Sequence, residues 1–323
     1  MKFMIGLLHA LLLFGATQAI GEPSWKPSRQ LHVIVPFSPG AAADTTIRIV
    51  SEQLAAALNQ AVVVENRGGA AGVIGTRAGA ASPPDGYTLI GGSDPPFTII
   101  PHLQEVPYDP LKAFSHVALV ADVPLFLVVR KDLAVNDVRE LMALADKKPG
   151  VLTIGSSGNG SSGHLAAELF KMKAHVNMLH VPYKGQVAAV SDVLAGRVDA
   201  TFSSLGPVRQ HVEAGNLKML AVSTSKRFIG LPDVPTVDES GVPGFDIAVW
   251  VGFSAPAGTP EKAIERINGE INQILESPQI NNKLTAMGYV PVMGTASDMA
   301  RRIEKDYKRF GQLIRDAKIS TDQ

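Results

Sequence analysis

The sequence predicts an α/β protein with two sheets, each covered by helices. Short β-branched runs alternate with segments whose apolar residues recur at helical spacing, and both halves of the chain repeat this plan. The 323 residues are enough for two domains that each bury a core. The chain has 30 glycines and 22 prolines but only 6% aromatic residues, which is typical of short units joined by turns.

The first half of the chain predicts a regular alternation of strands and helices. The β-branched run 31–36 indicates a buried strand, and residues 43–58 then place Ile47, Val50 and Leu54 on one helical face. In order, the strands are predicted at 31–36, 61–64, 87–90, 117–120 and 125–129, and the helices at 43–58, 72–80 and 136–147.

The second half repeats this alternation and ends in two helices. Because strands separated by helices form βαβ units, we expect mainly parallel sheets with helices on both faces. The strands are predicted at 151–154, 178–181, 198–202, 217–222 and 248–255, and the helices at 162–173, 187–194, 207–214, 261–275 and 296–317.

The order of these elements predicts a discontinuous first domain. Apolar strands near 122–130 and 248–255 would carry the chain across to a second domain and back. We therefore expect domain 1 to contain residues 20–124 and 250–323, and domain 2 to contain residues 125–249.

Composition excludes several classes of function. The 30 Lys+Arg residues balance 30 Asp+Glu residues, whereas nucleic-acid binding needs a basic surplus. The absence of cysteine excludes disulfides, thiolate metal sites and a cysteine nucleophile. The eight histidines are scattered, so we expect no metal and no cofactor.

The N-terminus has the pattern of a secretory signal peptide over residues 1–19. Lys2 is followed by an apolar run from Phe3 to Phe14, and small residues precede a cleavage point after Ala19. The run is shorter than the ~20 residues of a membrane-spanning helix. We expect a mature chain that is exported, periplasmic in a Gram-negative cell, monomeric and not inserted in the membrane.

Two glycine-rich turns each follow a strand and open a helix, at residues 36–44 and 155–164. Ligands bind at the carboxyl ends of strands in open α/β sheets. The first amides of a helix lack intrahelical partners and attract anions, and glycine permits close approach. The alternative for the second turn is simple helix capping by Ser161 or Ser162. Asp44 is expected to interact with the helix dipole more than with a ligand.

Two catalytic alternatives fit these turns less well. Gly158, Gly160 and Gly163 match the dinucleotide fingerprint, but the acid expected about 20 residues later is absent, which argues against a nicotinamide cofactor. A serine hydrolase using Ser161 or Ser157 is the other alternative. However, Ser161 and His164 belong to one helical turn, whereas a triad base normally comes from another element.

The order of several motifs resembles the Bug-type solute-binding proteins of the tripartite tricarboxylate transporters. This resemblance spans nearly the whole mature chain. The motifs are Val33–Gly40 with Asp44, Val62–Arg67, Pro84–Leu89, Pro107–Pro110, Gly155–His164, His180–Gly185, Gly196–Asp199, Leu231–Thr236 and Ala255–Pro260.

The resemblance implies a two-domain periplasmic-binding-protein fold, similar to type II, with a ligand cleft between the domains. It implies a non-enzymatic receptor that binds a small organic carboxylate and delivers it to integral membrane permease subunits. The same fold could instead signal to a membrane sensor, and the sequence leaves that alternative and the identity of the carboxylate open.

The resemblance also implies ligand contacts from both turns. By position these are Phe37, Pro39, Gly40, Ala41, Ala42 and Asp44 in domain 1, and Ser156, Ser157, Asn159, Ser161, Ser162, Gly163 and His164 in domain 2. Ala41 departs from the family, which commonly has a glycine there.

Further candidates follow other strands. The chemistry favours Lys184 as a cation for a second ligand carboxylate. Trp250 is expected as hinge packing or as a wall of the cleft. The remaining candidates are Ser93, Asp94, Tyr183 and Ser204.

Overall fold

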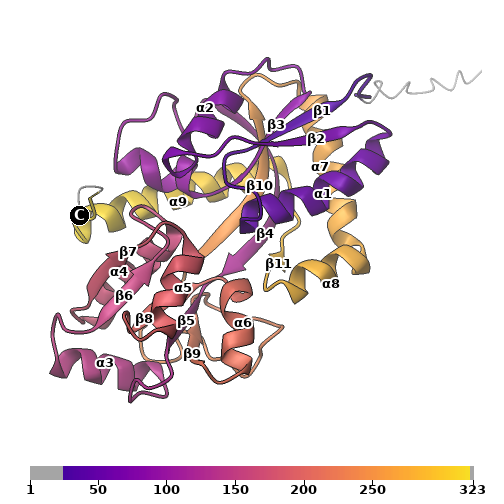
Figure 1. Ribbon diagram of the computed structural model, residues 1–323. Helices are drawn as coiled ribbons and strands as arrows, with labels where there is room; N and C mark the ends of the chain where they lie inside the picture. Colours follow the sequence, from indigo (N-terminus) through magenta and orange to yellow (C-terminus); the bar gives the residue numbers. More distant parts are fainter. Residues whose placement is uncertain (1–24, 321–323) are drawn as a thin grey trace, which may run out of the picture.

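The computed structural model describes residues 25–320 as two α/β domains, each built around one sheet (Figure 1). The predicted signal peptide, 1–19, lies outside the described residues. The two-domain α/β architecture predicted from the sequence is confirmed.

The larger sheet has six strands in the order β11-β4-β10-β3-β1-β2. Strand β1 pairs in parallel with β2 and β3, whereas β10 pairs antiparallel with β3 and β4. Its strands are β1 Leu31–Val35, β2 Val62–Asn66, β3 Thr88–Ser93, β4 Phe114–Pro124, β10 Ala248–Pro256 and β11 Val290–Pro291.

The smaller sheet has five strands in the order β7-β6-β8-β5-β9. Strand β6 pairs in parallel with β7 and β8, and β5 pairs antiparallel with β8 and β9. Its strands are β5 Phe126–Arg130, β6 Thr153–Ser156, β7 Leu179–Pro182, β8 Ala200–Ser203 and β9 Leu217–Val222.

Both sheets are mixed, instead of mainly parallel as the alternation of strands and helices predicted. The antiparallel pairs come from the strands that carry the chain between the domains. Strand β4 leads directly into β5, and β10 returns alongside β4 in the opposite direction (Figure 1). A strand that returns through the same sheet has to run antiparallel to the strand that left it.

Helices cover both sheets near the positions that the sequence predicts, together with helices that it did not predict. Helix α8 and the short strand β11 were not predicted, and α8 begins at Pro278 directly after α7. The helices are α1 Ala42–Leu58, α2 Val73–Ala80, α3 Val138–Lys147, α4 Ser162–Ala174, α5 Gln186–Leu194, α6 Leu205–Glu213, α7 Glu261–Glu276, α8 Pro278–Ala286 and α9 Ala296–Asp316, with short helices η1 Ala70–Gly72, η2 Pro95–Ile99 and η3 Ile100–His102. Within residues 25–320, no helix has the length and apolarity needed to cross a membrane.

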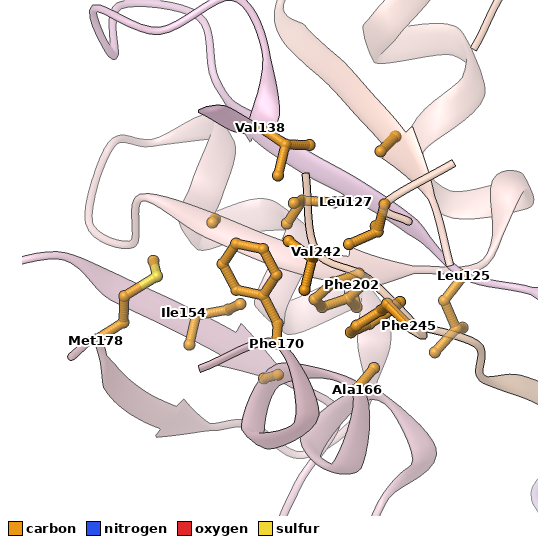
Figure 2. Close-up of a cluster of buried hydrophobic side chains, with 14 of the residues drawn as sticks. Leu125, Leu127, Val138, Ile154, Ala166, Phe170, Met178, Phe202, Val242 and Phe245 are labelled. Atoms are coloured by element: carbon orange, nitrogen blue, oxygen red, sulfur yellow. The ribbon is translucent and has the colours of Figure 1, made fainter. Parts of the chain in front are cut away.

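Aliphatic side chains and a group of phenylalanine rings form the core of the smaller domain (Figure 2). The rings of Phe202 and Phe245 stack with centroids 5.7 Å apart, and Phe170 packs edge-on against both. Phe310 and Ile314, near the end of α9, belong to this same buried cluster. The smaller domain therefore completes its core with residues from the end of the chain.

The other half of α9 packs against the larger sheet. Met299 and Ile303 lie in a buried cluster with Phe97 and Trp250, whose rings are 5.6 Å apart. Trp250 is fully buried, so it belongs to the packing where the chain returns to the larger sheet. Helix α9 thus contacts both domains.

Contacts join the domains on two sides. On one side, a Cβ at Gly160 would come within 2.8 Å of the Ile100 side chain. On the other, Arg209 of α6 donates a hydrogen bond to the carbonyl of Ala286 in α8, at 3.0 Å. The two domains therefore lie close together at both of these places.

We expect Gly75→Ala to destabilise the larger domain. A Cβ at Gly75 would lie 2.5 Å from the Arg67 carbonyl oxygen and 2.7 Å from the Cα of Pro36, so backbone must shift. Overpacking of this kind costs about 1–3 kcal/mol of unfolding free energy, which urea denaturation will measure. Gly269→Ala in α7 is the matched control, because nothing lies within 4 Å of its Cβ position and we expect it to stabilise. A Gly75→Ala protein as stable as wild type would contradict this packing.

Candidate functional site

A cavity of about 330 Å³ lies between the two sheets, where the starts of α1 and α4 meet. Strands that connect the domains contribute Val123 and Val249 to its wall. The full lining is Phe37, Ala42, Ala71, Pro95, Val123, Leu125, Ser157, Asn159, Gly160, Ser161, Ser162, Gly163, Gln186, Ser204 and Val249. Both glycine-rich turns predicted from the sequence therefore contribute to one cavity.

The turn before α1 presents backbone amides and no side-chain cap. Ala41 occupies the N-cap position in an extended conformation, and no side chain accepts from the first-turn amides there. Such amides have no intrahelical partner and carry partial positive charge. The first turn of α1, which includes the cavity-lining Ala42, is therefore suited to bind an anion.

Asp44 holds this turn in place from behind. Its buried carboxylate accepts hydrogen bonds from the amide of Gly40 at 2.9 Å and from Asn66 at 2.7 Å, and it pairs with Arg48 at 2.9 Å. Burial alone raises the pKa of Asp44, but the bonds from Gly40 and Asn66 and the Arg48 charge outweigh burial, so its pKa lies below the usual 3.8. Asp44 does not line the cavity, so its role is to hold the turn and not to contact a ligand directly.

The turn before α4 combines capping with exposure to the cavity. Ser161 is the N-cap, and its hydroxyl accepts from the amide of His164 at 3.2 Å. Gly158 and Gly160 have φ angles of 124° and 72°, which residues with a side chain rarely adopt. Ser161 and Ser162 also line the cavity, so capping does not exclude the predicted contact with a ligand.

Ser162 connects the two domains. Its hydroxyl donates a hydrogen bond of 3.0 Å to Asp94, which directly follows β3 of the larger sheet. Asp94 is completely buried and does not line the cavity, whereas Ser162 lies in its wall.

Several predicted site residues lie outside the cavity wall. Tyr183 donates its hydroxyl proton to Asp192 at 2.7 Å, Lys184 is exposed, and Ser93 is buried in β3. Pro39 and Gly40 are exposed, and Ala41 is half-buried before α1. These residues shape or flank the turns. The predicted site residues that do line the cavity are Phe37, Ala42, Ser157, Asn159, Ser161, Ser162, Gly163 and Ser204.

Two neutral histidines support the second turn from its far side. The rings of His164 and His180 stack in parallel, 3.8 Å apart, and Nδ1 of His164 accepts from the amide of Gly160 at 3.2 Å. Ser156 bonds to Nε2 of His180 at 2.7 Å. Burial lowers the pKa of His164 to about 3, with His180 and Lys171 adding repulsion, and lowers that of His180 to about 4, with Lys171 adding repulsion.

This histidine pair suits neither hydrolysis nor simple metal binding. Ser156 is fully buried and therefore inaccessible to a substrate. Glu168 brings a carboxylate within 4.8 Å of both rings. However, imidazole lone pairs lie in the ring plane, so two parallel stacked rings cannot both point at one ion without separating. Glu168 is also paired with Lys171 at 2.7 Å.

The described residues that line the cavity contain no charged side chain. A larger cavity, of about 430 Å³, lies elsewhere and includes Asp122, Arg302 and Asp306 but neither glycine-rich turn. Of these two cavities, the first joins the N-termini of α1 and α4, and helix N-termini are suited to bind anions.

The sequence did not indicate the apolar part of the lining. Pro95, Val123, Leu125 and Val249 come from strand ends and short helices whose residues look like ordinary core. Gln186 opens α5 and donates to Thr201 at 3.3 Å. Its position after Gly185, in a turn that follows a strand, was the one feature of the sequence that could have indicated Gln186 as a lining residue.

Similarity to known proteins identifies the family. The family model described as the tripartite tricarboxylate transporter family receptor, TctC, matches residues 46–319. The chain belongs to this receptor family. The resemblance found in the sequence is thereby confirmed.

Individual proteins are similar to this chain over nearly its whole length. BugT of Bordetella pertussis is 36% identical over 97% of this chain and 98% of its own. The structure of R. palustris Rpa4515 with adipate has a TM-score of 0.83 and 36% identity, covering 91% of this chain and 99% of that one. MatC (Rpa3494) of Rhodopseudomonas palustris with bound malate has a TM-score of 0.78 and 28% identity, covering 89% and 99%.

We expect Asp44→Asn to reduce stability at pH 7, because the amide loses the charge that pairs with Arg48 and that receives the Gly40 and Asn66 bonds. Hydrogen bonds to a charged group contribute about 1.5–3 kcal/mol each, and part of this will be lost. Because the folded pKa of Asp44 is lowered, its contribution is present above the unfolded pKa and disappears as the pH falls through the folded one. Denaturation midpoints at several pH values will measure this, with Asp233→Asn, at an exposed position, as control. Equal stability of the Asp44→Asn and wild-type proteins at pH 7 would contradict the role of Asp44.

Proposed function

We propose that this protein is a non-enzymatic receptor that binds a small organic carboxylate in the cavity between its domains. The observation that carries the proposal is a cavity lined by the starts of α1 and α4 without a charged side chain. Two relatives of similar structure are described with adipate and with malate, both dicarboxylates.

The energetics of the cavity favour an anion bound by neutral donors. A carboxylate loses its hydration when it is buried and needs several hydrogen bonds in return. First-turn amides of both helices and the hydroxyls of Ser157, Ser161 and Ser204 supply donors from opposite sides. Each charge-assisted bond contributes about 1.5–3 kcal/mol, so several bonds support micromolar binding after ordering costs.

The ligand would join the two domains. The proposed boundaries place residues 20–124 and 250–323 in domain 1 and residues 125–249 in domain 2, which is supported by the membership of the two sheets. A ligand that contacts both helix starts binds the closed form better than the open form and shifts the population toward closure. Closure would be the signal that a membrane partner reads.

The transport setting follows from the family. We propose that the mature chain is a periplasmic monomer, exported by residues 1–19, that delivers its ligand to integral membrane permease subunits. The family description as a transporter receptor supports this proposal.

A panel of mono-, di- and tricarboxylates will test the receptor function, with thermal shift and titration calorimetry as the measurements. A true ligand at 100 times its dissociation constant adds about 2.7 kcal/mol of stability. We expect at least one dicarboxylate, with adipate and malate as first probes, to bind at micromolar concentration. Binding of sugars or amines and of no carboxylate would overturn the proposal.

Ser157→Asp tests whether the cavity itself binds the anion. A carboxylate placed in the wall repels the ligand, and we expect affinity to fall at least 100-fold, which corresponds to about 2.7 kcal/mol. Ser157→Asn is the matched control, because it has nearly the same size without the charge and should bind far more tightly than Ser157→Asp. Similar affinities for these two variants would place the binding site elsewhere.

A further inference from the structure

A buried carboxyl group lies directly behind the cavity wall. Asp94 follows the last residue of β3 and has no exposed surface. Its Oδ2 accepts the hydroxyl proton of Ser162 at 3.0 Å, across the boundary between the two domains. Its Oδ1 is also buried and has no hydrogen-bond partner within residues 25–320. The carboxyl group is therefore only partly satisfied in its ionised form.

Few charges surround Asp94. Arg302 and Asp306 of α9 act on it from one side, with opposite effects. Arg302 is itself engaged by Asp306 at 2.6 Å and by Asp122 at 3.4 Å. The adjoining residues of η2, 95–99, and of β10, 248–256, include no ionisable side chain. Helix α4, which carries Ser162, has the ionisable residues His164, Glu168, Lys171 and Lys173.

This environment favours the protonated form of Asp94 more than water does. Burial raises the pKa of Asp94 to about 7. The Ser162 bond and Arg302 oppose this effect, and Asp306 adds to it. A ligand carboxylate bound nearby would raise this pKa further, because a second negative charge disfavours the ionised form.

The protonation of Asp94 decides what Ser162 can offer to the cavity. A serine hydroxyl has one proton to donate and two lone pairs that accept. When Asp94 is ionised, Ser162 gives its proton to Asp94 and presents only lone pairs to the cavity, which repel a carboxylate. When Asp94 is protonated, it can donate to Ser162, and the Ser162 proton becomes available for a ligand oxygen.

We propose that Asp94 takes up a proton when a carboxylate binds, and that Ser162 thereby turns its hydroxyl proton from Asp94 to the ligand. This inference rests on the proposed function as a carboxylate receptor. Asp94 is a positioning residue, because it acts on the ligand through Ser162 and does not line the cavity. The proton comes from solvent and remains on the Asp94 carboxyl group while the ligand is bound.

Coupled proton uptake makes affinity depend on pH. Above the pKa of free Asp94, ligand binding has to bring in a proton, so affinity falls by a factor approaching ten for each pH unit. The sign is fixed by linkage: the bound state holds more protons than the free state, so lower pH favours binding. Dicarboxylates such as adipate and malate remain ionised above pH of about 6.5, so their own titration does not cause this change.

Titration calorimetry between pH of about 6.5 and 8.5, in two buffers of different ionisation enthalpy, measures both quantities. With adipate and malate as probes, we expect wild-type affinity to fall with pH and the buffers to reveal net proton uptake. Asp94→Asn should bind with a nearly constant affinity and no proton uptake, because its amide group donates to Ser162 at every pH. Asp146→Asn, on an exposed part of α3, is the matched control and should behave as wild type.

The Ser162→Ala variant distinguishes the proposed relay through the Ser162 hydroxyl from direct repulsion between ionised Asp94 and the ligand. Without the hydroxyl, protonated Asp94 has nothing to transmit, so we expect weaker binding with most of the pH dependence lost. A Ser162→Ala protein with wild-type pH dependence would overturn the relay, and so would wild-type binding without proton uptake, even though the receptor function would stand. A wild-type protein that binds no carboxylate at any pH would overturn both the receptor function and this inference.

Discussion

The central constraint on the proposed receptor function is that an anion would have to leave water and enter a cavity whose described wall has no charged side chain. Only hydrogen-bond donors can replace the lost hydration, and helix starts supply them at fixed positions. The two sheets hold α1 and α4 so that their first turns face one cavity. Neutral donors also avoid the desolvation cost that a buried lysine or arginine would add in the unliganded state.

Residues behind the cavity wall give the turns their shape. Asp44 fixes the turn before α1 through Gly40 and Asn66. The stacked rings of His164 and His180 fix the turn before α4, because His164 accepts a hydrogen bond from the backbone amide of Gly160. The residues that the family motifs predict for the site therefore belong to two groups. Some line the cavity, and the others hold its wall in place.

The sequence predicted the parts of the site that depend on local chemistry. Glycine, serine and a following helix identified both turns, and hydrophobic periodicity located the helices that they open. Val123, Leu125 and Val249 could not be predicted, because their contact with the cavity depends on how the strands cross between domains. The Ser162–Asp94 bond escaped prediction for the same reason, as it joins residues 68 positions apart. Strand pairing was also beyond the sequence pattern, which shows where β10 lies but not its direction.

The position of β10 in the larger sheet has a consequence for the order of folding. It lies between β4 and β3, yet the ribosome makes it more than 120 residues after β4 ends. Until it arrives, both neighbours keep open hydrogen-bonding edges that invite wrong pairing. The smaller sheet can form earlier, but its core still awaits Phe310 and Ile314 from α9. Neither domain is complete until synthesis has nearly finished, which is compatible with the proposed export of the chain before it has folded.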